Sequence, residues 1–204
     1  MRIEPPSAPR HARPGGRAGA FTVEFALTLV FFLALVFAML ELGRAVYLWN
    51  TLQEVTRRAA RGAAIANFAD PAIMDQVRQR ALLRASPGAL ALGGALGEGH
   101  VRIDYLALDS GNQLQAIAVL PACPPRNLVN CQSDPHGASC IRFVRVRICL
   151  PGAGSACQAV PYQPMVPWVG DLFAIGGVAI NLPQSTTVTR AETLGYRPGM
   201  ALCP

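Results

Sequence analysis

The sequence has no lysine and few charged residues of any kind. All 18 basic residues are arginines, charged residues make up 15% of the chain, and the formal net charge is +6. Four arginines and one acid, Glu4, precede residue 20, so the remaining residues carry a formal charge of only +3. A nucleic-acid-binding protein needs basic residues gathered into a patch, with aromatic side chains among them. The sequence contains no such patch, and we expect no nucleic-acid partner.

Histidine and the motifs of common enzymes are also scarce. The chain has three histidines and no C-x-x-C pair, which argues against a zinc site. It lacks G-x-S-x-G, H-E-x-x-H and a phosphate-binding glycine loop. Asp134 and His136, with Ser133 and Ser139 nearby, lie in a proline- and cysteine-rich stretch and do not form a convincing catalytic set. We therefore expect no enzymatic activity, no metal and no cofactor.

Proline is absent between Ala20 and Asp70, and charge, glycine and proline are all absent from Phe25 to Leu40. As a helix, the apolar residues 20–42 would be about 35 Å long, enough for a hydrocarbon core of about 30 Å. Only a helix lets an isolated lipid-exposed segment satisfy its own backbone. A buried core helix is the alternative, but this segment is apolar on every face. The sequence predicts a single transmembrane helix.

The helix is expected to continue beyond the apolar segment, to residue 67. Apolar residues recur there at intervals of three and four, which predicts one buried stripe: Leu48, Leu52, Val55, Ala59, Ala63 and Ala66. Asp70 and Pro71 predict the start of a second helix, and residues 88–99 are expected to be a flexible connector.

The second half of the sequence predicts β-structure. Residues 101–107 and 115–119 flank a turn and predict a hairpin. Residues 143–149 alternate most clearly, with Arg145 and Arg147 on a face expected to be solvated. Further strands are predicted at 178–182 and 186–192, a short helix at 165–175, and a loop at 121–139.

All six cysteines lie in this second half: Cys123, Cys131, Cys140, Cys149, Cys157 and Cys203. An even number in one region predicts disulfides and an oxidising compartment. Short loops favour Cys149–Cys157 and Cys123–Cys131, leaving Cys140–Cys203, among fifteen possible pairings. The expected fold is α+β: one transmembrane helix extended into a long amphipathic helix and packed on a small antiparallel sheet. The expected segments are a basic leader at 1–19, the transmembrane helix at 20–42, a helical stalk and second helix at 43–87, and a disulfide-bonded β-rich domain at 88–204.

One carboxylate interrupts the apolar segment. Glu24 lies about one turn inside it, where an acid is costly and is a functional candidate. Gly19 precedes Glu24 by five residues, and four arginines precede Gly19, which favours a cytoplasmic N-terminus. An acid without a partner near the membrane surface is the simpler reading of Glu24. The whole pattern resembles the processing site of type IV prepilins. The resemblance implies that a prepilin peptidase cuts between Gly19 and Ala20, and that Glu24 pairs with the new amino group of a neighbouring subunit.

A narrower family fits as well. The stretch GAFTVEFALTLVFFLALVFAMLELGRAVYLWNTLQEVTRRAARGAA resembles the TadE-like minor pseudopilins of tight-adherence (Tad/Flp) pilus systems, including the membrane-exit motif with Glu41, Gly43 and Arg44. The stretches VRVRICLP and STTVTRAE resemble the family more weakly. The resemblance implies a subunit needed for pilus assembly, with inner-membrane lipid, prepilin peptidase, other pilins and the assembly platform as partners.

The same resemblance implies a protein of the bacterial inner membrane whose C-terminal domain is extracytoplasmic. Such a pilus could serve adhesion, biofilm formation or secretion. Two alternatives stay open: a pseudopilin of a type II secretion or competence system, and an unprocessed membrane-anchored binding protein of the envelope.

Overall fold

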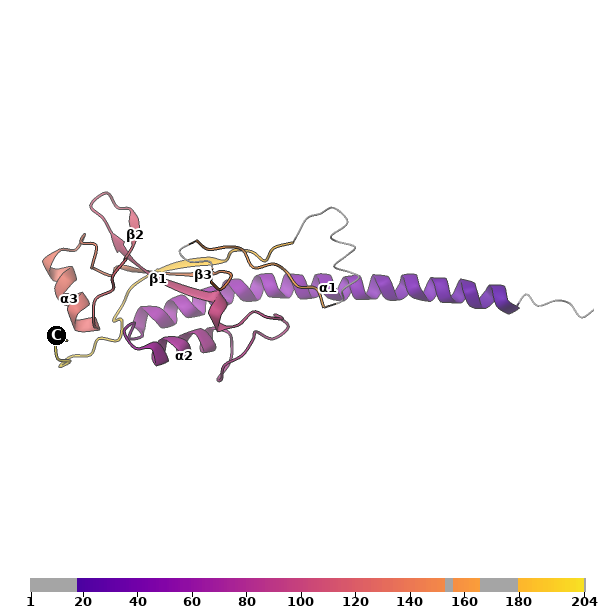
Figure 1. The fold of residues 1–204 in the computed structure, drawn as a ribbon, viewed down its shortest axis with the longest axis horizontal. Helices are drawn as coiled ribbons and strands as arrows, with labels where there is room; N and C mark the ends of the chain where they lie inside the picture. The colour runs from indigo at the N-terminus through magenta and orange to yellow at the C-terminus, as the bar shows by residue number, and fades with distance from the viewer. Residues whose placement is uncertain (1–17, 153–155, 166–179, 204) are drawn as a thin grey trace, which may run out of the picture. The chain divides into compact units, whose positions relative to one another are not determined.

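A computed structural model describes residues 18–152, 156–165 and 180–203 (Figure 1). The fold is α+β, as predicted. Its elements, in chain order, are α1 (Ala18–Ile65), α2 (Pro71–Ala81), the 3₁₀ turn η1 (Glu98–His100), β1 (Val101–Leu108), β2 (Leu114–Ala116), α3 (Pro124–Ser133), β3 (Phe143–Ile148) and β4 (Thr186–Arg190). The chain divides into two compact units between Leu40 and Glu41.

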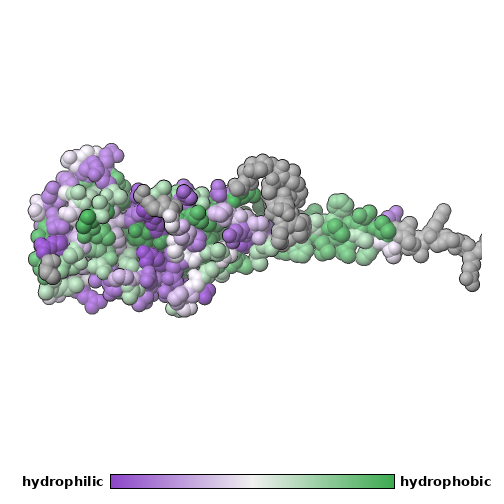
Figure 2. Space-filling view, in the orientation of Figure 1, coloured by the Kyte–Doolittle hydropathy of each residue, from purple (hydrophilic) through white to green (hydrophobic). Residues whose placement is uncertain are grey.

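The part of α1 in the first unit is apolar and exposed. Its large apolar side chains from Phe21 to Leu40, apart from Val36, are 40% exposed or more, and Figure 2 shows apolar side chains over most of the visible face of this stretch. Among the described residues, α1 is the one helix long and apolar enough to cross a membrane, by length and composition. Such a surface requires an apolar environment, since in water about 25 cal/mol is lost per Å² of apolar area left exposed.

The part of α1 in the second unit carries the predicted buried stripe. Leu48, Leu52 and Val55 are each 1% exposed, and alanines continue the stripe toward the C-terminal end of the helix. Because alanine side chains are small, the chain after β4 lies directly on the helix, where the N–H groups of Glu192 and Leu194 donate to the Ala64 carbonyl. The stripe forms one core with the inward residues of the sheet.

The sheet has four antiparallel strands in the order β2-β1-β3-β4. The predicted hairpin is confirmed, with Leu106 opposite Ala116. The alternation predicted for β3 is also confirmed: Val144, Val146 and Ile148 are at most 2% exposed and belong to the core shared with α1. Strand β4 pairs with β3 from Thr186 to Arg190.

Two segments predicted to be irregular are held in place by hydrogen bonds and burial. Residues 121–139 were expected to form a loop, but they contain α3. Its first residue is Pro124, which suits that position because proline has a helical φ and no N–H that would lack a partner. Residues 88–99 were expected to be a flexible connector, yet Leu90 and Leu96 are each 3% exposed, and the Leu90 N–H donates to the Leu96 carbonyl at 2.7 Å. The loop prediction was wrong because local composition did not reveal α3. The connector has no helix or strand before η1, as expected, but the burial of its leucines was not visible in its composition.

Helix α2 begins at Pro71 as predicted, with the Asp70 carboxylate accepting from the N–H groups of Ala72 and Ile73. The helix predicted at 165–175 and most of the strand predicted at 178–182 lie outside the described residues. At the end of that strand, Asn181 forms one isolated bridge with Pro161.

All six cysteines form disulfides: Cys123–Cys203, Cys131–Cys140 and Cys149–Cys157. The third pair is the expected one, and the other two pairings were wrong. Helix α3 explains the error, because Cys123 caps the helix and Cys131 lies eight residues further along it. Eight residues of helix span about 12 Å, whereas disulfide-bonded Cα atoms lie within about 7 Å of each other.

The disulfides should differ in their contribution to stability. In the chain-entropy model, the crosslink that closes the longer loop removes more entropy from the unfolded chain. The loops span sequence separations of 80 for Cys123–Cys203 and 9 for Cys131–Cys140. Replacing both cysteines by serine should lower the free energy of unfolding by about 4.5 kcal/mol for the first pair and about 2.6 kcal/mol for the second. Peptide mapping without reduction checks the pairing, and a peptide linking Cys123 to Cys131 would contradict it.

Candidate functional site

The second unit begins with two buried charged residues on α1. Glu41 and Arg44 are 4% and 8% exposed, whereas Leu40 and Leu42 are each more than 60% exposed. Arg44 Nη1 donates to Glu41 Oε1 at 2.9 Å, a spacing of three residues that places both side chains on one face of the helix. A buried ion pair is tolerable only when the remaining donors and acceptors are also satisfied.

Two loops supply those partners. Arg44 Nε donates to the carbonyl of Leu92 at 2.8 Å, and Arg44 Nη1 donates to the carbonyl of Gln163 at 2.8 Å. The hydroxyl of Tyr162 donates to Glu41 Oε1, and the N–H of Met165 reaches the same oxygen at 3.3 Å. The Arg44 guanidinium also lies over the Tyr162 ring, 5.2 Å from its centroid. We call Glu41, Arg44 and Tyr162 the helix-exit cluster.

The helix-exit cluster keeps its phenol neutral. Burial raises the pKa of Tyr162 to about 12, and the hydrogen bond to Glu41 acts in the same direction, against the charge of Arg44. A neutral phenol can donate to the carboxylate over the whole physiological range. Every member of the cluster is engaged with another member or with a backbone group, so the arrangement suits holding the two loops on α1 rather than reacting with a substrate.

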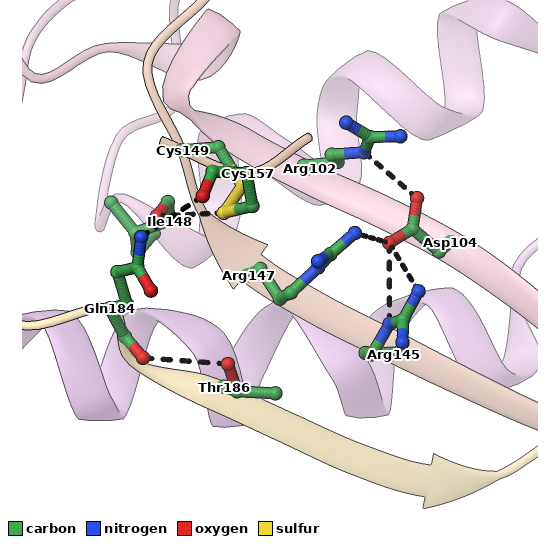
Figure 3. The surroundings of a disulfide bond; sticks show 9 residues. All are labelled: Arg102, Asp104, Arg145, Arg147, Ile148, Cys149, Cys157, Gln184 and Thr186. Atoms are coloured by element: carbon green, nitrogen blue, oxygen red, sulfur yellow. Dashed lines mark hydrogen bonds and ion pairs between the residues drawn. A yellow bond between two sulfur atoms is a disulfide. The ribbon is translucent and has the colours of Figure 1, made fainter. Parts of the chain in front are cut away.

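A second charged cluster lies on the outer face of the sheet (Figure 3). The Asp104 carboxylate accepts from Arg102 Nε at 2.9 Å, from Arg147 Nη2 at 2.6 Å and from Arg145 Nη2 at 3.3 Å. Burial raises the pKa of Asp104, but the hydrogen bonds from Arg102 and Arg147 outweigh burial and hold the pKa below its usual value. Arg145 and Arg147 were expected to be solvated. Instead, their ion pairs with Asp104 connect β3 to β1.

Sequence reasoning missed Asp104 and Tyr162 because both act through long-range pairing. The register that sets Asp104 opposite Arg145 joins strands about forty residues apart. The alternating arginines of β3 indicated an outward face, but nothing local to them indicated the acid on β1.

The other predicted site residues are placed as follows. Gly19 and Ala20 lie in the first turn of α1. Glu24 is exposed, and its carboxylate has no hydrogen-bond partner among the described residues. Gly43, between the two members of the ion pair, is exposed and does not join them. The roles of Gly19 and Ala20 in processing and of Glu24 in pairing stay predictions. Within the described ranges, no group of three or more histidine, cysteine or acidic side chains could hold a metal.

The fold is thus α+β, with one described helix that is long and apolar enough to cross a membrane. Residues 19–61 match the family model described as TadE-like protein, which is the family that the sequence resembles. The match covers most of α1, including Glu24, Glu41 and Arg44, and supports a membrane protein associated with Tad pili. That family consists of pilus components rather than enzymes. Comparisons with curated proteins and with solved structures find no match.

Removing the hydroxyl of Tyr162 should weaken the helix-exit cluster. Tyr162→Phe keeps the ring over Arg44 but leaves Glu41 short of one donor, so the free energy of unfolding should fall by about 1–2 kcal/mol at neutral pH. The folded phenol ionises at a higher pH than the unfolded one. The advantage of the parent is therefore full below pH 10 and is lost as pH rises toward about 12.

Thermal unfolding of the full chain in detergent, followed by near-ultraviolet circular dichroism, measures this difference. Tyr196→Phe is the control, because the Tyr196 hydroxyl has no hydrogen bond among the described residues. Equal stability of Tyr162→Phe and the parent would show that the hydroxyl contributes nothing.

Proposed function

We propose that the protein is a TadE-like minor pseudopilin, a non-enzymatic, membrane-anchored subunit needed to assemble a Flp/Tad-type pilus. The observation that carries this proposal is the family match over residues 19–61. That stretch combines Gly19, Glu24 and an exposed apolar helix in one segment. The structure adds a small disulfide-bonded sheet domain whose core includes the apolar stripe in the C-terminal half of the same helix.

The proposal includes removal of the leader between Gly19 and Ala20. Glycine has no side chain to obstruct a peptidase that reads the backbone at this boundary. The leader carries four of the arginines, so it belongs on the cytoplasmic side of the inner membrane. The second unit then lies outside the cytoplasm. Its three disulfides support that side, because disulfides persist in oxidising compartments.

The proposal also gives Glu24 a role in assembly. After cleavage, the new amino group of Ala20 carries a positive charge at the edge of the membrane. A carboxylate costs about 3 kcal/mol near the middle of a membrane helix on insertion scales. Pairing of Glu24 with the amino group of a neighbouring subunit lowers the cost of both charges. The exposure of Glu24 in the single chain leaves it available for that contact.

The variant Glu24→Gln tests both steps because it keeps the shape of the side chain and removes its charge. We expect Glu24→Gln to insert and to be cleaved like the parent, so that intact mass gives a chain starting at Ala20 in both. We expect the variant to lose pilus assembly and to lose co-purification with the other pilins of its system.

Glu54→Gln is the matched control, since Glu54 is an acid of the same helix whose partner, Arg58, belongs to its own chain. The control should assemble like the parent. A mature chain starting at Met1, or after residue 36, would exclude a pilin-type protein. Normal assembly of Glu24→Gln would leave Glu24 as an interfacial acid without a pairing role.

A further inference from the structure

The outer edge of β4 carries backbone groups without a partner among the described residues. Antiparallel strands alternate between residue pairs that exchange both hydrogen bonds and pairs that exchange none. The Ile148 N–H donates to the Ser185 carbonyl, and the Ala191 N–H donates to the Arg142 carbonyl, so the odd-numbered residues face β3. The N–H and C=O groups of the even-numbered residues therefore point away from the sheet: Thr186, Val188 and Arg190.

The opposite edge of the sheet is open in the same way. The Ile117 N–H donates to the Tyr105 carbonyl, and the Asp109 N–H donates to the Gln113 carbonyl. The odd-numbered residues of β2 therefore direct their backbone groups toward β1. The backbone groups of two residues of β2 consequently point outward: Leu114 and Ala116. Neither edge strand contains a proline, a lysine or a bulge, the usual protections of an exposed edge.

Each edge also presents one apolar side chain. Leu114 and Val188 are both 43% exposed. The registers Leu106 with Ala116 and Val188 with Arg145 place both side chains on the face of the sheet that bears Asp104, opposite the face that packs on α1. Two strands paired edge to edge would bring these side chains together on one face.

The direction of the strands decides which copy can dock. Thr187 bonds to Thr56 at 2.9 Å and Glu192 bonds to Ala64, so β4 runs in the same direction as α1. If the β4 strands of two copies paired with each other in an antiparallel way, the α1 helices of the two copies would point in opposite directions. Because the sheet has four antiparallel strands, its two edges also run in opposite directions. A copy placed beside the first in the same orientation thus sets its β2 antiparallel to β4.

We propose that a second copy of this chain docks its β2 edge on β4, with both α1 helices in one direction. This inference takes one premise from the proposed function, namely that both copies are anchored in the same membrane. In the favoured register, Val188 lies opposite Leu114 of the second copy. Arg190 then meets the turn that carries Asp109 of the second copy, so opposite charges adjoin. The two contacting surfaces differ, so the contact does not close on itself and copies add in a row.

Cysteine crosslinking in membranes tests the proposed register. Opposed residues of a hydrogen-bonded pair have Cα atoms about 5.5 Å apart, which suits a disulfide. Since all native cysteines are paired, an introduced cysteine is the only free thiol. Two differently tagged chains, Val188→Cys and Leu114→Cys, should form a mixed dimer when co-expressed and oxidised mildly. A chain carrying both substitutions should give a ladder of multimers.

Ala116→Pro in the Leu114→Cys chain removes one outward N–H while leaving the ladder with β1 intact. It should reduce the mixed dimer about fivefold, as expected for one lost hydrogen bond, whereas Ala116→Ser should not. Leu128→Cys, a similarly exposed residue of α3 at 42%, controls for random collision. A mixed dimer no stronger than this control, or a dominant Val188→Cys homodimer, would overturn the proposal. Membrane fractionation of the same cells tests the anchor separately.

Discussion

The buried ion pair between Glu41 and Arg44 is the interaction on which the arrangement of the second unit depends. N-terminal to it, the side chains of α1 are mostly apolar and exposed; C-terminal to it, one face of α1 is buried in the core. Removing one partner of such a pair leaves a buried charge and typically costs about 3–5 kcal/mol. The pair therefore fixes the point on a single helix at which the folded domain begins.

The helix-exit cluster also explains how a small domain is held on a long helix. The loops that contribute Leu92 and Tyr162 lie far apart in sequence, yet both bond to the same ion pair, Leu92 to Arg44 and Tyr162 to Glu41. Further along α1, small alanines let the chain after β4 approach the helix backbone. The cluster and the alanines thus hold the sheet domain on α1 at two separate levels, and the disulfides constrain the chain between and beyond the strands.

Local periodicity predicted much of this fold. The spacing from Leu48 to Ala63 predicted the buried stripe, and the alternation around Val144 and Val146 predicted β3. Features that depend on distant residues were not predictable. Cys123 and Cys131 form a short loop in sequence, but α3 separates them in space, so length alone gave a wrong pairing. Asp104 and Tyr162 likewise gain their roles from strands and loops that the sequence does not place beside them. In the candidate site, the N-terminal motif was visible because its residues are neighbours on one helix.

The central claim of the proposal is that α1 lies in lipid before Glu41 and outside the lipid, as part of the folded domain, after it. Labelling of intact membranes with an impermeant maleimide tests this claim at two exposed residues, Leu33 and Gln53, each replaced by cysteine in a chain whose native cysteines are all paired. Leu33→Cys should react only after detergent is added, whereas Gln53→Cys should react with the reagent on the extracytoplasmic side before detergent. Equal reaction of both cysteines in intact membranes would contradict the account.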